Sequence, residues 1–90
     1  MPTLKIPSPL RPYADGQSAI TAPGQNVSEL LENTLEQFPH LKKHLYSDDK
    51  QLRPFVNIFL GEENIKELQG IDTPLNENDT LLIIPSIAGG

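Results

Sequence analysis

The strongest constraint on the fold is a single amphipathic helix, expected over residues 27–38. Its apolar side chains recur at helical spacing and form one face, made of Val27, Leu30, Leu31, Leu35 and Phe38. Asn26 followed by Glu29 is typical of an N-cap with a capping box, and Pro39 ends the pattern. A helix of this kind must bury its apolar face against another layer.

Short strands on both sides of the helix provide that layer. Residues 3–6 alternate polar and apolar side chains until three prolines interrupt the pattern between residues 7 and 12. Asp15-Gly16 is a hairpin signal, and residues 18–22 can form a returning strand before Pro23-Gly24. The first part of the chain is therefore predicted to be a hairpin with a long connection.

The second half of the chain predicts two longer strands. Residues 39–54 are polar, with a short helical turn expected at 41–46 and a loop tip at 48–50. Residues 55–60 are rich in aromatic and branched side chains and lead into a turn at 61–64, after which Ile65 is expected to begin a short edge strand. Residues 80–84 are apolar at every position but the first, which predicts a strand at the sheet's centre or covered on both faces. The order favours an α+β fold, a mixed sheet packed on one main helix.

Composition excludes several function classes. With 90 residues the chain is expected to be one domain, residues 1–90, and its net charge of −5 offers no basic surface for nucleic acid. It has no cysteine, hence no disulfide, no thiolate nucleophile and no sulfur ligand for zinc. No signal-peptide or membrane-spanning apolar run is present, so we expect a cytoplasmic protein with no membrane partner.

The chain ends in two adjacent glycines, Gly89-Gly90, within a five-residue segment, 86–90, that follows the expected central strand. The simplest interpretation is a frayed terminus or a cloning remnant. Residues 86–90, predicted to form a flexible tail, could however extend ~17 Å beyond the strand, enough to enter another protein's active site. Glycines pass through a narrow channel and leave the terminal carboxylate unhindered. Activation as an acyl-adenylate would then let a sulfur donor convert the carboxylate of Gly90 into a thiocarboxylate.

Several segments carry a family resemblance. The ending Ile84-Pro85-Ser86-Ile87-Ala88-Gly89-Gly90, after a strand-helix-strand order, resembles the MoaD/ThiS family of β-grasp, ubiquitin-like sulfur carriers over essentially the whole chain. Within that family the chain is most similar to the CysO-type carriers of cysteine biosynthesis. The segments similar to that subgroup are Ile6-Pro7, Leu10-Arg11-Pro12, Gly16-Gln17, Phe55-Val56-Asn57-Ile58 and the Pro-x-x-Ala-Gly-Gly ending.

The resemblance implies a β-grasp fold and a carrier that is not itself a catalyst. Gly90 would be the adenylation and thiocarboxylate site, with Gly89, Ala88 and Ile87 recognised as the tail. The implied partners are a ThiF/MoeB-type activating enzyme that uses ATP, a sulfur donor and an acceptor synthase. The acceptor would be a cysteine synthase-like enzyme, or else a molybdopterin or thiazole synthase, since carriers for all three pathways share the tail. No cofactor is expected on the carrier.

A partner that binds the tail must also contact the sheet around its root, so an apolar docking face is predicted there. The candidates are Phe59, Ile84 and Ile87, with Arg11 as a charged candidate and with Phe55 and Leu82 also considered, although core packing explains most of the apolar residues equally well. Arg11 and Arg53 could orient an acidic partner.

No residue pair predicts catalysis or a metal site. His40 and His44 are four apart but lack a third ligand, and are interpreted as two solvated histidines on a short helix. Asp48-Asp49 and Glu62-Glu63 are interpreted as solvated turn residues.

Three function classes remain open. The chain could be a sulfur carrier, a protein modifier that joins its glycine carboxylate to a lysine amine, or an interaction module with an inert tail. A self-contained enzyme ranks last, because the sequence contains no specific nucleophile-base pair or metal constellation.

Overall fold

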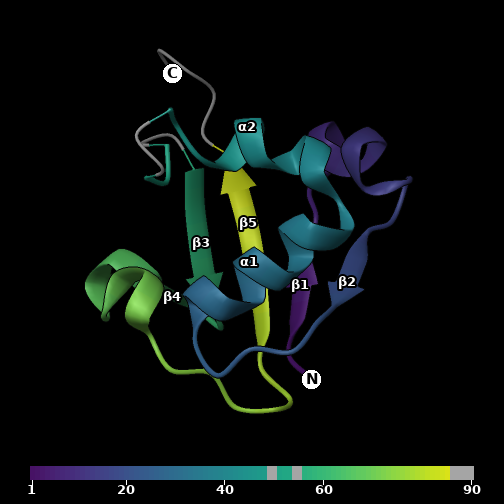
Figure 1. Cartoon of the computed structure of the whole chain (residues 1–90). Coiled ribbons are helices and arrows are strands. Elements are labelled where there is room, and N and C mark those ends of the chain that lie inside the picture. The colour runs from purple at the N-terminus through teal and green to yellow at the C-terminus, as the bar shows by residue number, and fades with distance from the viewer. Residues whose placement is uncertain (49–50, 54–55, 86–90) are drawn as a thin grey trace.

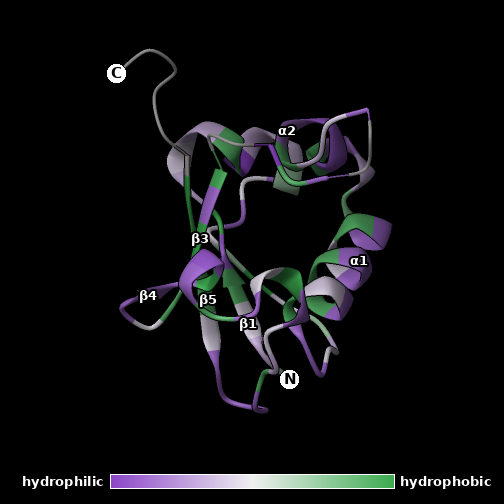
Figure 2. Ribbon diagram, turned by 90° about the vertical axis from the view of Figure 1, so that its left-hand side faces the viewer, coloured by the Kyte–Doolittle hydropathy of each residue, from purple (hydrophilic) through white to green (hydrophobic). Residues whose placement is uncertain are grey.

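The computed structural model describes residues 1–48, 51–53 and 56–85, and these form two layers (Figure 1). One layer is a mixed five-stranded sheet in the order β2-β1-β5-β3-β4, and helix α1 (Val27–Gln37) lies across one face of it (Figure 2). The predicted α+β architecture of a mixed sheet on one main helix is confirmed.

Helix α1 begins and ends where its sequence signals lie. The Asn26 side chain accepts a hydrogen bond from the Glu29 amide at 2.8 Å, while the Glu29 carboxylate accepts from the Gln25 amide at 3.1 Å. In a standard capping box the Glu29 carboxylate would accept from the amide of the N-cap residue, Asn26. Here it accepts from the amide of the residue before it, Gln25. The helix ends at Gln37, one residue earlier than predicted, because Phe38 leaves helical geometry ahead of Pro39.

The predicted hairpin joins β1 (Thr3–Lys5) and β2 (Ala19–Thr21), which are antiparallel with Leu4 opposite Ile20. The connection between them holds a 3₁₀ helix, η1 (Ser8–Ala14), that the proline pattern did not reveal. A proline is tolerated in the first turn of a helix, where Pro9 lies, but Pro12 lies inside η1. Leu10 and Ala14 on η1 are buried, so packing on the core maintains this segment.

The last strand, β5 (Thr80–Pro85), is central as predicted. It pairs in parallel with β1 and antiparallel with β3 (Val56–Leu60). Leu81 and Ile83 are 0% and 1% exposed, whereas Leu82 and Ile84 are 39% and 42% exposed. Of the two predicted explanations for this apolar strand, the central position is therefore right, and complete cover on both faces is wrong.

The edge strand predicted to begin at Ile65 begins two residues earlier, at Glu63. Strand β4 is Glu63–Asn64, antiparallel to β3, and Ile65 begins the 3₁₀ helix η3 (Ile65–Glu67) with its side chain buried. Gly61 adopts a left-handed φ of 64°, which lets the chain reverse immediately after β3. The Asn64 side chain then accepts from the Lys66 amide and caps η3.

The remaining elements close the ends of the two layers. The helical turn predicted at 41–46 is a 3₁₀ turn, η2 (Pro39–Leu41), continued by α2 (Lys42–Leu45), and a further 3₁₀ turn, η4 (Gly70–Asp72), precedes β5. No helix in the described ranges is long and apolar enough to cross a bilayer. The core contains buried side chains from both layers: Leu4, Ile6, Leu10, Ala14, Ile20, Ala22, Val27, Leu30, Leu31, Leu41, Leu45, Val56, Ile58, Ile65, Leu81 and Ile83.

Candidate functional site

The root of the carboxyl-terminal tail is the end of the central strand. Pro85, the last described residue, is paired with Val56 on β3, while the pairing with β1 extends only as far as Leu82. The chain leaves the sheet at the end where β1 also finishes, because β1 and β5 are parallel (Figure 1). The predicted tail residues Ile87, Ala88, Gly89 and Gly90 lie outside the described residues, so their roles remain predictions.

The face of the sheet away from α1 carries an apolar strip leading to this root. Phe59 is directly opposite Leu82, and Asn57 is opposite Ile84, so these side chains share one face. We call Phe59, Leu82 and Ile84 the outer strip. Lys5 on β1 lies beside Leu82 in the register, so the strip has a cationic neighbour. Two predicted docking residues, Phe59 and Ile84, are thus on one face, and their docking role remains a prediction.

Arg11 belongs to a different part of the molecule from the outer strip. It lies on η1, beyond the end of β1, where its Nε donates to the Ile6 carbonyl at 3.1 Å. Arg53 is held in a similar way, its Nε donating to the Lys43 carbonyl at 2.8 Å. In the described ranges neither guanidinium forms an ion pair within 4.0 Å. Their role in orienting an acidic partner remains a prediction.

The two histidines differ from each other. His40 is exposed on η2, as predicted, whereas His44 on α2 is half-buried and stacks on Tyr13 with ring centroids 4.1 Å apart. The interpretation of His44 as a solvated residue is wrong, because η1 folds over α2 and brings Tyr13 to it. Its Nε2 is buried without a hydrogen-bond partner in the part of the chain described. Those same residues contain no group of three or more potential metal ligands.

Burial, together with the charges of Lys43 and Arg53, lowers the pKa of His44 below its ordinary value. The unfolded chain therefore takes up the proton first as the pH falls below about 6.5, and stability should decrease there. We expect His44→Phe, which keeps a ring against Tyr13, to show a shallower loss of unfolding free energy than wild type between about pH 7.5 and about pH 5. Urea titrations across that range measure it.

His40→Gln is the matched control, since that side chain is exposed, and it should retain the wild-type pH profile. An equally steep profile in the His44→Phe variant would contradict the assignment.

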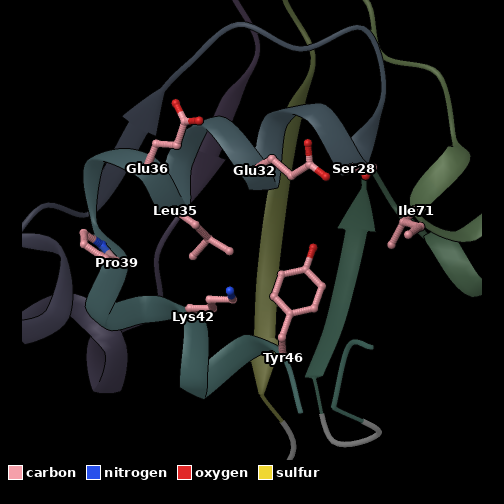
Figure 3. Close-up of a pocket in the computed structure, with 8 residues that line it drawn as sticks. All are labelled: Ser28, Glu32, Leu35, Glu36, Pro39, Lys42, Tyr46 and Ile71. Atoms are coloured by element: carbon pink, nitrogen blue, oxygen red, sulfur yellow. The ribbon is translucent and has the colours of Figure 1, made fainter. Parts of the chain in front are cut away.

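A pocket of about 530 Å³ lies on the opposite layer, between α1, α2 and η4 (Figure 3). The sequence pattern alone does not reveal this pocket. The four-residue spacing of Ser28, Glu32 and Glu36 indicated one helix face, but their meeting with Tyr46 depends on where α2 packs. The pocket is lined by Ser28, Glu32, Leu35, Glu36, Pro39, Lys42, Tyr46 and Ile71.

Among the described residues, the acidic pairs belong to no group of three or more potential metal ligands. Glu62 and Glu63 are exposed at the β3–β4 reversal, with Glu63 in β4 rather than in a turn, and Asp48 is exposed while its neighbour Asp49 lies outside the described residues.

Comparison with known proteins places these features in context. The model of the ThiS family matches residues 4–90. The sulfur carrier protein CysO of Mycobacterium tuberculosis is 29% identical over 90 residues, covering 98% of this chain and 97% of that protein. A chain of the Amycolatopsis orientalis BexX/CysO complex matches with a TM-score of 0.90 at 28% identity, covering 100% of both chains. Small archaeal modifier protein 1 from Methanosarcina acetivorans matches with a TM-score of 0.88 at 26% identity, covering 99% of this chain and 95% of that one.

Proposed function

Because this chain belongs to the ThiS family, we propose that it is a sulfur carrier whose working group is the carboxylate of Gly90. The observation that carries this proposal is the position of the Gly89-Gly90 ending, which follows the central strand β5 after only three intervening residues, 86–88. Strand β5 is paired with β1 as far as Leu82 and with β3 as far as Pro85, so the tail starts from a strand that is held in the sheet up to its last residue. Similarity to CysO over nearly the whole chain supports the same function.

The chemistry proposed for Gly90 needs two steps, both on another protein. An activating enzyme of the ThiF/MoeB type would let a Gly90 carboxylate oxygen attack the α-phosphate of ATP, releasing pyrophosphate and leaving an acyl-adenylate. A sulfide-equivalent donor would then attack the acyl carbon and displace AMP. The resulting thiocarboxylate is a sulfur nucleophile, and the carrier is consumed and regenerated as a cosubstrate.

The side chains of this chain contribute recognition rather than catalysis. The outer strip of Phe59, Leu82 and Ile84 offers an apolar contact beside the tail root, and Arg11 lies at the same end of the sheet. A partner that covers the strip while binding Ile87, Ala88 and Gly89 would hold the Gly90 carboxylate at its reactive centre.

The proposed acceptor of the sulfur is a cysteine synthase-like enzyme, in keeping with the CysO resemblance. Molybdopterin synthase and thiazole synthase are the alternatives, because the tail chemistry is common to all three. The structure of a BexX/CysO complex supports the expectation that a carrier of this shape docks on a second protein.

The test is an intact-mass measurement on the purified chain after incubation with ATP, a sulfide source and a ThiF/MoeB-type activating enzyme of the same organism. We expect a mass gain equal to the exchange of one oxygen for one sulfur, located at Gly90, absent without ATP and absent when Gly90 is deleted. An unchanged mass with each such enzyme of that organism would contradict the carrier function.

A second candidate is a protein modifier that forms an isopeptide bond with lysine through Gly90. The similarity to small archaeal modifier protein 1 favours keeping it. Conjugation would give higher-mass species in a cell lysate that persist under reducing, denaturing conditions and carry a branched Gly-Gly remnant on lysine. Thiocarboxylate formation without any such species would assign the chain to sulfur transfer alone.

A further inference from the structure

The pocket on the helical layer lies on the opposite side of the sheet from the outer strip. Its lining combines the apolar side chains of Leu35, Pro39 and Ile71 with the polar groups of Glu32, Lys42 and Tyr46. Figure 3 shows Leu35 pointing into the space between α1 and α2, with the Glu32 carboxylate beyond the hydroxyl end of Tyr46. The lining therefore combines a hydrocarbon surface with polar groups at its edge.

The acidic groups at the edge are arranged unfavourably for the isolated protein. Glu32 and Glu36 are four residues apart on α1, so two like charges are neighbours on the same helix face. Glu36 also lies in the last turn, where the helix dipole disfavours a negative charge, and that turn contains no basic residue. Neither carboxylate forms an ion pair within 4.0 Å in the described ranges. A bound cation would relieve both conflicts.

Tyr46 adds a second polar group to the same edge. Burial, and the negative charge of Glu32, raise the pKa of Tyr46 above its ordinary value. The hydroxyl therefore keeps its proton at neutral pH. Among the described residues no hydrogen bond to this hydroxyl is present, and the half-buried ring lines the pocket, where it offers an aromatic surface to a planar cation.

We infer that this pocket binds an arginine side chain presented by a partner protein. The hydrocarbon stem would pack on Leu35, Pro39 and Ile71, as long cationic side chains do on apolar surfaces. The guanidinium would lie against Glu32 and Glu36, beside the Tyr46 ring. Because the pocket and the outer strip are on opposite layers, one carrier can be bound at both.

Lys42 lies on the α2 side of the pocket, and the effect of removing its charge on binding distinguishes a cationic ligand from an anionic one. In this arrangement its ammonium repels the incoming guanidinium, so removing that charge should strengthen binding. If the pocket instead received a carboxylate or a zwitterion, Lys42 would be the attracting group and its removal would weaken binding. Two carboxylates against one ammonium favour the cation.

The experiment is a titration of the ¹⁵N-labelled full chain with N-acetyl-arginine amide, followed by amide chemical shifts, with N-acetyl-citrulline amide as the neutral isostere. Shifts should concentrate on α1, α2 and η4, and citrulline should bind roughly fivefold more weakly. Glu32→Gln and Glu36→Gln should each weaken arginine binding roughly two- to fivefold, and Lys42→Gln should strengthen it by a similar factor.

Glu62→Gln is the matched control, because it removes the same charge from an exposed position in the β3–β4 turn, and it should leave binding unchanged. All these positions are exposed, so the spectra of the variants should remain those of the folded chain. Equal binding of citrulline, weaker binding by Lys42→Gln, or shifts spread outside α1, α2 and η4 would each overturn the inference. Sulfur loading at Gly90 is measured separately, so failure here leaves that proposal standing.

Discussion

Replacing Leu81 with alanine is expected to lower the free energy of unfolding by about 2 to 5 kcal/mol. Leu81 is 0% exposed in the central strand, paired with Leu4 on β1 and Leu60 on β3. Truncation removes three buried carbons and leaves a cavity between two well-packed layers, which can relax only in part. The total free energy of unfolding of a domain of this size is about 5 to 15 kcal/mol, so the expected loss is a large fraction of its stability. Urea unfolding followed by circular dichroism measures it.

Leu82→Ala is the matched control, one residue along the same strand but on the opposite face and 39% exposed. We expect it to change stability by less than about 1 kcal/mol. If the outer strip is the docking face, this variant should instead weaken association with the activating enzyme. Equal stability losses in the two variants would contradict the assignment of the buried face.

Replacing Gly24 with alanine is expected to destabilise the fold by about 1 to 3 kcal/mol. Gly24 lies against α1 so closely that an added Cβ would be 2.6 Å from the Leu30 amide nitrogen and 2.9 Å from its Cα. These are backbone atoms in the middle of a helix, which cannot rotate away as a side chain could. The helix or the connection before it must move, and the melting temperature should fall accordingly.

Gln25→Ala separates this steric effect from a general sensitivity of the segment. The Gln25 side chain is exposed, and the two hydrogen bonds at that residue use its backbone, donating to Glu29 and accepting from the Leu75 amide. We expect a change within about 0.5 kcal/mol. A Gly24→Ala variant as stable as Gln25→Ala would show that the close approach to Leu30 costs nothing.

The elements that the sequence predicted well carry their own signals. Helix α1 has a capping side chain at Asn26, an apolar stripe and a proline just past its end, so local chemistry fixes its position. Strand β5 is apolar at consecutive positions, which is typical of a sheet centre. Gly89 and Gly90 could be singled out as a chemical site because they are the end of the chain, a property independent of folding.

The features that the sequence did not predict depend on packing between distant segments. Helix η1 looks like a proline-rich turn, and it is helical because Leu10 and Ala14 are buried. The half-buried state of His44 requires Tyr13, thirty-one positions earlier, to stack on it. The pocket forms only because Tyr46, at the end of α2, and Glu32, on α1, line the same space (Figure 3). None of these contacts produces a periodic pattern in the amino-acid sequence.

The pairing of β1 with β5 makes the order of events in folding depend on the end of the chain. Residues 3–5 cannot complete their pairing in the sheet until residues 80–82 are present. Contacts between such distant parts of the sequence form slowly. While the chain is being synthesised, β1 can find β2 but not its other neighbour. The sheet is therefore completed only after residues 80–85 have left the ribosome. A chain that ends before β5 would lack both the complete sheet and the carboxylate of Gly90. A partner that recognises the folded sheet would therefore not bind such a defective carrier.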